Sequence, residues 1–224
     1  MIRLHAVVEG QTEETFVRDV LAPEFGARDV FVDVHRITTG RKRSRVFRGG
    51  ISGYNQLKSD LILWMKEDQR PDAWFTTMID FYGLPEDFPG YGECVGRPDA
   101  RERVECLEEH LNRDLSHRRF IPYIQLHEFE ALLFSEPQTF ESVFPDAPAV
   151  IQELAAIRNA FPTPEHINDR PDLAPSKRIL QLLPDYRKPV AGPLIIQQIG
   201  LPTLRRECLH FNEWIGKIEK AVSQ

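Results

Sequence analysis

Acidic residues follow three separate runs of apolar, β-branched and aromatic residues in this chain. Glu9 follows the first run, Asp80 follows another, and Glu128 and Glu130 follow a third. In an open α/β sheet the ligand crevice lies outside the carboxyl ends of the strands, so carboxylates placed after buried strands meet there. Hard divalent cations prefer oxygen ligands of this kind. The spacing therefore predicts a metal-dependent site suited to phosphate chemistry.

The predicted cation is Mg²⁺ or Mn²⁺, and its candidate ligands are Glu9, Asp80, Glu128 and Glu130. Mg²⁺ is bound through a few carboxylates together with water and substrate phosphate, and a pair of such ions stabilises both the attacking and the leaving oxygen of a phosphodiester. Glu128 is preferred to Glu130. If the backbone stays extended after Leu126 the two glutamates point to one side, and if it is helical they diverge. The alternative for each acid is a helix cap or a solvated side chain.

Basic residues gather in two places, although the formal net charge of the chain is −6. One group lies in an expected loop and would follow a nucleic-acid backbone through contacts that weaken as salt rises. The other follows Pro175-Ser176 at an expected helix start, where backbone N–H groups favour anions. Lys188 is a further candidate, for neutralising charge on a scissile phosphate. Solvated loops and surface salt bridges are the alternative. The two groups are Arg41, Lys42, Arg43, Arg45 and Arg48, and Lys177 and Arg178.

The elements that must position these side chains alternate between strands and helices, which predicts βαβ units and a largely parallel sheet. The first helix is expected to carry Glu13 and Glu14 in its first turn, where the helix dipole favours negative charge, and to end at Pro23. Beyond residue 135, prolines punctuate short helical segments. An α/β core over residues 1–135 and a helical C-terminal lobe over 136–224, packed on the core, are therefore expected. The expected strands are residues 2–8, 31–37, 73–79 and 120–126.

Composition predicts a protein of the cytoplasm that needs no disulfide bonds to fold. Hydrophobic residues make up 42% of the 224 residues, enough to bury a core. No signal peptide is expected at the N-terminus, and no apolar run approaches the length of a membrane span. Cys94, Cys106 and Cys208 are odd in number and widely spaced, which predicts free buried thiols. Phe211 and Trp214, one helical turn apart, are expected in the core.

Several motifs resemble known families. Val8-Glu9-Gly10-Gln11-Thr12-Glu13 resembles the start of a Toprim domain, the metal-binding fold shared by topoisomerases, primases and OLD-type nucleases, and the stretch 78–85 resembles its second motif. Over nearly its full length the chain resembles the bacterial family DUF4276. The stretches that carry this second resemblance are Asp80-Phe81-Tyr82-Gly83-Leu84-Pro85, His127-Glu128-Phe129-Glu130-Ala131-Leu132-Leu133-Phe134, Ala174-Pro175-Ser176-Lys177-Arg178 and Cys208-Leu209-His210-Phe211-Asn212-Glu213-Trp214.

The Toprim resemblance implies a mostly parallel sheet flanked by helices. It also implies that Glu9 is a catalytic glutamate or metal ligand and that Asp80 is the first acid of an Asp-x-Asp pair. Tyr82 stands where the second acid of that pair belongs. Glu128 or Glu130 could supply the missing carboxylate. Relatives of this kind are encoded beside ABC-type or OLD-like ATPases in phage-defence loci, which implies an effector subunit with an ATPase partner.

Three functions stay open at this point. The first is an Mg²⁺-dependent nuclease or other phosphodiesterase that hydrolyses DNA or RNA, with Glu9, Asp80, Glu128 and Lys188 in catalysis. The second is a non-catalytic regulatory module that partners an ATPase, which Tyr82 favours because it removes a ligand. The third is a receiver-like or phosphatase domain in which Asp80 is the nucleophile.

Overall fold

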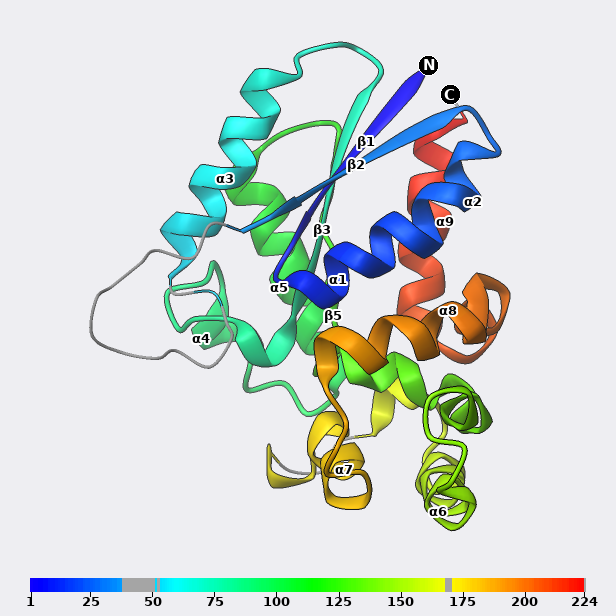
Figure 1. The fold of residues 1–224 in the computed structure, drawn as a ribbon. Coiled ribbons are helices and arrows are strands. Elements are labelled where there is room, and N and C mark those ends of the chain that lie inside the picture. The colour runs from blue at the N-terminus through cyan, green and yellow to red at the C-terminus, as the bar shows by residue number, and fades with distance from the viewer. Residues whose placement is uncertain (38–50, 52, 168–170, 224) are drawn as a thin grey trace, which may run out of the picture.

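The computed structural model describes residues 1–37, 51, 53–167 and 171–223. At its centre lies a sheet with the strand order β2-β1-β3-β4, and β5 also pairs with β3. All of these pairings are parallel, so the strands end at one edge of the sheet (Figure 1). The expected α/β class with a mostly parallel sheet is confirmed. The strands are β1 (Ile2–Val8), β2 (Val30–Arg36), β3 (Ala73–Asp80), β4 (Phe120–Ile121) and β5 (Ile124–Gln125).

Strands β1 and β3 form the buried middle of the sheet. Residues 4–8 of β1 are all buried, and β3 is buried at every position but Trp74. A strand covered on both faces needs such a continuous apolar run rather than an alternating one. The two strands pair from Arg3 with Ala73 to Val8 with Met78, so they end side by side.

The expectation of a single continuous strand over residues 120–126 was wrong. It is broken at Pro122 into β4 and β5, because proline has no backbone N–H to donate to the ladder. The Thr77 side chain replaces the missing ladder bonds. Its Oγ1 accepts a hydrogen bond from the Tyr123 N–H at 2.9 Å and donates one to the Tyr123 carbonyl at 3.0 Å.

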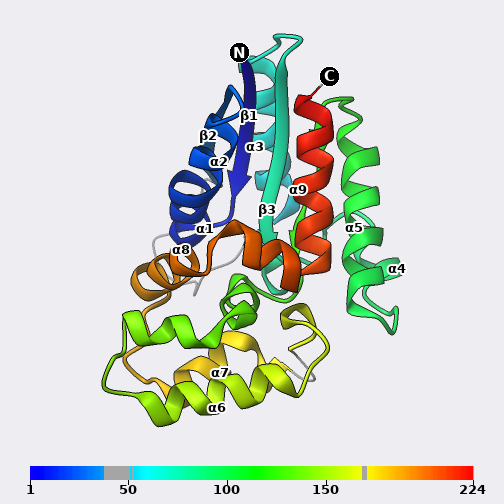
Figure 2. The ribbon, with the colours of Figure 1, turned by 90° about the vertical axis from the view of Figure 1, so that its right-hand side faces the viewer.

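Helices cover both faces of the sheet (Figures 1 and 2). On one face the core extends over the N-terminal helices and the C-terminal helices together, and on the other it lies under α3, α4 and α5. The first face carries α1 (Gln11–Phe16), the π-helical turn Val17–Leu21, α2 (Ala22–Gly26), α8 (Lys188–Glu207) and α9 (Leu209–Val222). The second carries α3 (Tyr54–Glu67), α4 (Tyr91–Cys94) and α5 (Ala100–Leu115).

The first helix does not end at Pro23 as expected. A π-helical turn precedes the proline, and α2 continues through it to Gly26. Pro23 stands in the first turn of α2, where its missing N–H removes little from the helix. The π-helical turn Val17–Leu21 joins α1 to α2 just before the proline.

After Gln125 the described residues form helical elements and no strand. None of the described helices is long and apolar enough to cross a membrane. The helix α9 packs directly against the sheet: Trp214 Nε1 donates to Thr76 Oγ1 at 2.8 Å, and its ring stacks on Tyr123 with centroids 4.2 Å apart. Phe211 and Trp214 are buried, as expected. The division of the chain at residue 135 stays a prediction. The other helical elements of this region are Phe129–Ser135, Pro137–Ser142, α6 (Pro148–Asn159), Pro164–His166, Pro171–Leu173 and α7 (Pro175–Leu182).

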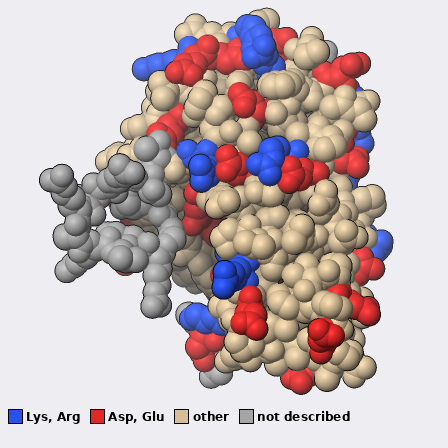
Figure 3. All heavy atoms as spheres, in the orientation of Figure 1, with Lys and Arg blue, Asp and Glu red and all other residues tan. Residues whose placement is uncertain are grey.

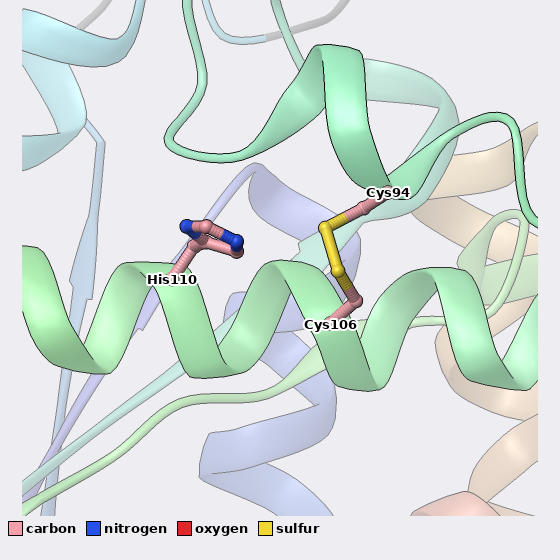
Figure 4. A group of neighbouring side chains, drawn as sticks. All are labelled: Cys94, Cys106 and His110. Carbon is pink, nitrogen blue, oxygen red and sulfur yellow. A yellow bond between two sulfur atoms is a disulfide. The ribbon is translucent and has the colours of Figure 1, made fainter.

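The expectation of three free thiols was wrong for two of them. Cys94 and Cys106 form a disulfide, whereas Cys208 is free and buried. The chain turns back between α4 and α5, which brings the two Cα atoms to 5.7 Å, within the range that a disulfide requires. Figure 4 shows Cys94 coming from α4 and Cys106 from α5, with His110 one turn further along the same helix. Linear spacing does not reveal such a fold-back.

Replacing Trp214 with alanine should destabilise the whole chain. The substitution removes a buried ring from the contact with Tyr123 and removes a hydrogen bond to Thr76, so we expect a loss of about 3–5 kcal/mol in the free energy of unfolding. Urea denaturation followed by far-ultraviolet circular dichroism measures it. Leu209→Ala, at a half-exposed position of the same helix, is the matched control and should lose less than about 1 kcal/mol. Equal losses would show that α9 does not anchor on the sheet.

Candidate functional site

The acids of the two central strands meet at the carboxyl edge of the sheet. Glu9 follows β1, and Asp80 is the last residue of the neighbouring strand β3. The Asp80 N–H donates to Glu9 Oε2 at 3.1 Å. Asp80 in turn accepts a hydrogen bond at Oδ1 from the Phe129 N–H at 2.9 Å. The structure therefore places Glu9 and Asp80 together, where the strand ends predicted them.

Gly83 lies against the carboxylate of Glu9. A Cβ atom at this position would lie 2.7 Å from Glu9 Oε2 and 2.9 Å from Oε1. A Cβ this close would force the Glu9 carboxylate to shift, so the short turn Phe81–Gly83 passes directly over the carboxylate. A larger residue here would displace Glu9.

The ammonium of Lys188 lies among three carboxylates. Its Nζ is 3.0 Å from Glu130 Oε2, 3.3 Å from Asp80 Oδ2 and 3.7 Å from Glu13 Oε1. About a third of the Lys188 side chain (36%) stays exposed, whereas those of Asp80 and Glu130 are 9% and 0% exposed. Lys188 is thus the link between buried acids and the solvent side of the site.

Gly192 lets Lys188 reach this position. Lys188 begins α8, and Gly192 lies about one turn further along the same helix. A Cβ on Gly192 would meet Thr12 Cγ2 at 3.4 Å and the Tyr186 hydroxyl at 3.2 Å. The missing side chain therefore allows α8 to pack closely on α1, and this packing brings Lys188 over the end of β1.

Glu13 is a member of the site that the sequence analysis missed. It was expected to interact with the helix dipole, but its side chain is only 4% exposed and faces Lys188. Its spacing from buried residues of the same helix could have revealed this position. Glu13 stands three and four residues before Phe16 and Val17, which are both fully buried, so it lies on the inward stripe of the helix.

Glu128 and Glu130 diverge, because the backbone turns between them and the preceding strand. His127 has a left-handed conformation (φ 61°), Glu128 is extended, and a 3₁₀ helix starts at Phe129. Glu130 therefore faces Lys188 and accepts a hydrogen bond from the Tyr186 hydroxyl at 3.4 Å.

Glu128 faces the start of α7 instead. It accepts hydrogen bonds from the Ser176 N–H at 2.5 Å and from the Ser176 hydroxyl at 3.0 Å. The N-terminal N–H group that was expected to bind an external anion is therefore satisfied by a carboxylate of the chain itself. The preference for Glu128 over Glu130 as a metal ligand stays a prediction. Of the two, Glu130 forms the ion pair with the Lys188 ammonium.

Burial and mutual repulsion make the carboxylates harder to ionise. Burial, followed by the charge of Asp80, raises the pKa of Glu9 to about 8. Burial also raises the pKa of Glu130 to about 7, although the attraction of Lys188 opposes the rise. It raises the pKa values of Glu13 and Glu128 as well. Burial would lower the pKa of Lys188, but the carboxylates around it outweigh that effect and raise it.

The donor set fits a hard divalent cation. Three carboxylates, of Glu13, Asp80 and Glu130, surround the Lys188 ammonium, and Glu9 is joined to Asp80; every ligand atom that these groups offer is an oxygen, as Mg²⁺ and Mn²⁺ prefer. The acids are spread around Lys188. Within the described residues, no three of these acids bring one carboxylate oxygen each within 4.8 Å of one another. Closing on a shared cation would therefore require Lys188 to move aside.

Tyr82 lies in the turn after β3, near Glu128. Its N–H donates to the His127 carbonyl at 3.0 Å, and the residue is 39% exposed. Burial, followed by the charge of Glu128, raises the pKa of the phenol to about 12. Tyr82 therefore offers a neutral hydrogen-bond donor where the Toprim pattern has a carboxylate.

The basic residues predicted for nucleic acid are only partly described. Arg41, Lys42, Arg43, Arg45 and Arg48 lie outside the described residues. Lys177 and Arg178 lie on α7, where Arg178 Nε donates to the Leu173 carbonyl at 2.7 Å and its guanidinium lies over the Phe161 ring. On the face drawn in Figure 3, the described Lys and Arg side chains alternate with Asp and Glu rather than gathering together.

Comparisons with known proteins give one family and one solved structure. The model of the family described as "Domain of unknown function (DUF4276)" matches residues 8–219, a span that includes Glu9, Asp80 and Lys188. Among curated proteins no match is found. The C-terminal region of the Burkholderia pseudomallei OLD protein is similar over 99% of both chains, with 15% sequence identity and a TM-score of 0.47.

The stability of the protein should fall as pH rises from about 5 to 8, and Glu9→Gln should reduce that fall. Because the pKa of Glu9 is raised from 4.5 to about 8, the folded state holds a proton that the unfolded chain has released. The contribution of Glu9 to the free energy of unfolding is fully present below pH 4.5 and is lost as pH rises through about 8. The glutamine side chain of the variant cannot ionise, but its carbonyl still accepts the Asp80 N–H.

Urea denaturation at several pH values measures this effect. At pH 8 the variant should be more stable than wild type by on the order of 1 kcal/mol. Glu24→Gln, at an exposed position, is the matched control and should follow the wild-type profile. Parallel profiles for wild type and Glu9→Gln would show that Glu9 is not forced toward its protonated form.

Proposed function

The chain belongs to the DUF4276 family, and we propose that it is a divalent-metal-dependent phosphodiesterase that cuts nucleic acid. The observation that carries the proposal is the excess of carboxylates around Lys188. Glu13, Asp80 and Glu130 share one ammonium, and within the described part of the chain no cation forms an ion pair with Glu9. Buried carboxyl groups of this kind keep their protons unless a cation balances the charge of the ionised form.

Glu9 and Asp80 are the residues that would hold the cation, and Glu130 and Glu13 are further candidate ligands. Glu9 and Asp80 come from adjacent strand ends and are already joined by a hydrogen bond from the Asp80 N–H. The chemistry that Mg²⁺ or Mn²⁺ supplies at such sites is activation of water and stabilisation of charge on a phosphoryl oxygen. The resemblance of residues 8–13 and 78–85 to the Toprim motifs supports the same two ligands.

Two side chains have the properties that proton and phosphate handling need. The pKa of Glu9, raised by burial to about 8, is close to neutral pH, where a group accepts and releases protons most effectively. Lys188 lies at the first position of α8 with its side chain partly exposed, so its ammonium can turn from the carboxylates to an incoming phosphate.

Nucleic acid is the proposed substrate because of the basic stretch 41–48, whose cations would contact the phosphate backbone. Lys177 and Arg178 are a second proposed contact, on α7 beside Glu128. Both DNA and RNA fit this description. An ABC-type or OLD-like ATPase is the proposed partner, in a bacterial phage-defence system.

Tyr82 favours a second function, that of a regulatory subunit without catalytic activity. It places a phenol where the Toprim pattern has a carboxylate ligand, and it removes one negative charge from the site. Titration calorimetry separates the two functions. A nuclease binds Mg²⁺ through Glu9 and Asp80, whereas a regulatory subunit binds its ATPase and leaves Mg²⁺ unbound.

Purified protein should degrade nucleic acid in the presence of Mg²⁺ or Mn²⁺, and Glu9→Gln should abolish that activity. The substitution removes both a cation ligand and the proton acceptor while keeping the hydrogen bond to Asp80. We expect a loss of at least about 100-fold in the rate. Gel assays with double-stranded DNA, single-stranded DNA and RNA measure it, and EDTA should stop the reaction.

Glu24→Gln is the matched control for this assay and should cut like wild type, because its side chain is exposed and lies outside the site. The proposal of a nuclease fails if wild type and Glu9→Gln behave alike on all three substrates with either metal.

Lys188→Met should separate cation binding from catalysis. Removing the ammonium frees Asp80 and Glu130, so Mg²⁺ should bind more tightly, by about tenfold for each 1.4 kcal/mol of repulsion relieved. Cleavage should nevertheless fall, because the ammonium that would contact the phosphate is gone. Calorimetry and the gel assay measure the two effects. Weaker Mg²⁺ binding in the variant would show that Lys188 does not compete for the carboxylates.

A further inference from the structure

A second group of metal-ligand atoms lies on the face of the sheet that α3 covers. His5 Nδ1 is 3.3 Å from His35 Nε2 and 3.8 Å from Asp33 Oδ2, and His35 Nε2 is 3.4 Å from Asp33 Oδ2. Zinc binds nitrogen and oxygen at about 2.0–2.2 Å in a tetrahedron, which places neighbouring ligand atoms about 3.3–3.6 Å apart. The triangle in the structure has nearly these dimensions. One cation could therefore contact all three atoms with little movement.

The sheet itself holds the three side chains on one face. His5 of β1 pairs in register with Asp33 of β2, and His35 follows two residues later on the same strand. Side chains two residues apart on a strand point to the same face. The His35 ring is also stacked on Trp64 of α3, with the ring centroids 3.4 Å apart. The arrangement is therefore built by strands and a helix rather than by a loop.

A carboxylate behind His5 orients its ring as metal-binding histidines require. His5 Nε2 is 2.9 Å from Asp68 Oδ2, and Asp68 accepts a further hydrogen bond from Arg70 Nε at 2.8 Å. When Nε2 carries the proton and donates it to Asp68, the lone pair of Nδ1 faces His35 and Asp33. Histidine ligands are commonly fixed in this way, by a carboxylate bound to the second ring nitrogen.

A simple hydrogen bond between the two histidines explains only part of this geometry. It accounts for the contact between His5 and His35, but not for the carboxylate of Asp33 beside both rings. The Asp33 side chain is 43% exposed, yet its Oδ2 lies against both rings. Its inward position is what a shared cation accounts for.

We propose that His5, His35 and Asp33 bind one zinc-class divalent cation. The nitrogen donors select Zn²⁺ and similar transition metals, whereas the carboxylates around Lys188 select Mg²⁺ or Mn²⁺. The partly exposed Asp33 leaves a fourth position for water or an external ligand. A bound cation ties the edge strand β2 to β1. The proposal does not depend on the nuclease function.

Cobalt binding tests the proposal directly. Co²⁺ titrated into metal-free protein should produce the strong visible absorption of tetrahedral coordination, equivalent at saturation to one tetrahedral ion per chain, and Zn²⁺ should displace that ion. Asp33→Asn and His35→Gln should weaken binding by at least about 100-fold, and Asp68→Asn by about 10–100-fold. Circular dichroism of the metal-free variants checks that each is folded.

Glu9→Gln is the control variant and should show the same tetrahedral Co²⁺ absorption as wild type, because Glu9 belongs to the other site. Absence of tetrahedral Co²⁺ absorption in wild type would overturn the proposal. Unchanged binding in folded Asp33→Asn and His35→Gln would also overturn it, as would a loss of binding in Glu9→Gln alone.

Discussion

The balance of charge at the carboxyl edge of the sheet is the constraint on which the rest of this structure depends. Parallel strands end side by side, so the acids that follow β1 and β3 must lie together. Burial makes Glu9 less acidic, and the ammonium placed among these acids comes from Lys188. That lysine lies 108 residues away from Asp80 along the chain. The site therefore exists only when the C-terminal helices are packed on the sheet.

Small residues make this packing possible. Gly192 lets α8 approach α1, and Gly83 lets the turn after β3 pass over Glu9. Under the proposed function, the site has two states of charge. With Lys188 turned inward, the ammonium satisfies the acids. With Lys188 turned outward, the acids require another cation, and the ammonium can reach an anionic substrate. In this account, competition between lysine and metal is part of how the site works.

The sequence predicts which residues stand at the strand ends better than it predicts which residues lie near them in space. An acid directly after a buried run is visible in the sequence, so Glu9 and Asp80 could be found, and the alternation of elements predicted the parallel sheet. The divergence of Glu128 from Glu130 depends on the left-handed backbone of His127, which no local pattern reveals. The ion pairs of Lys188 and the disulfide of Cys94 depend on tertiary packing. Glu13 was visible in principle, because it shares the buried stripe of its helix.

The central claim is that the acids around Lys188 hold a divalent cation, and a crystal of the protein soaked in Mn²⁺ tests it most directly. The account predicts an anomalous scattering peak within bonding distance of Glu9 and Asp80, with the Lys188 ammonium withdrawn from both Asp80 and Glu130. A map with no peak at these carboxylates under saturating Mn²⁺, and with Lys188 still paired to Asp80 and Glu130, would contradict it.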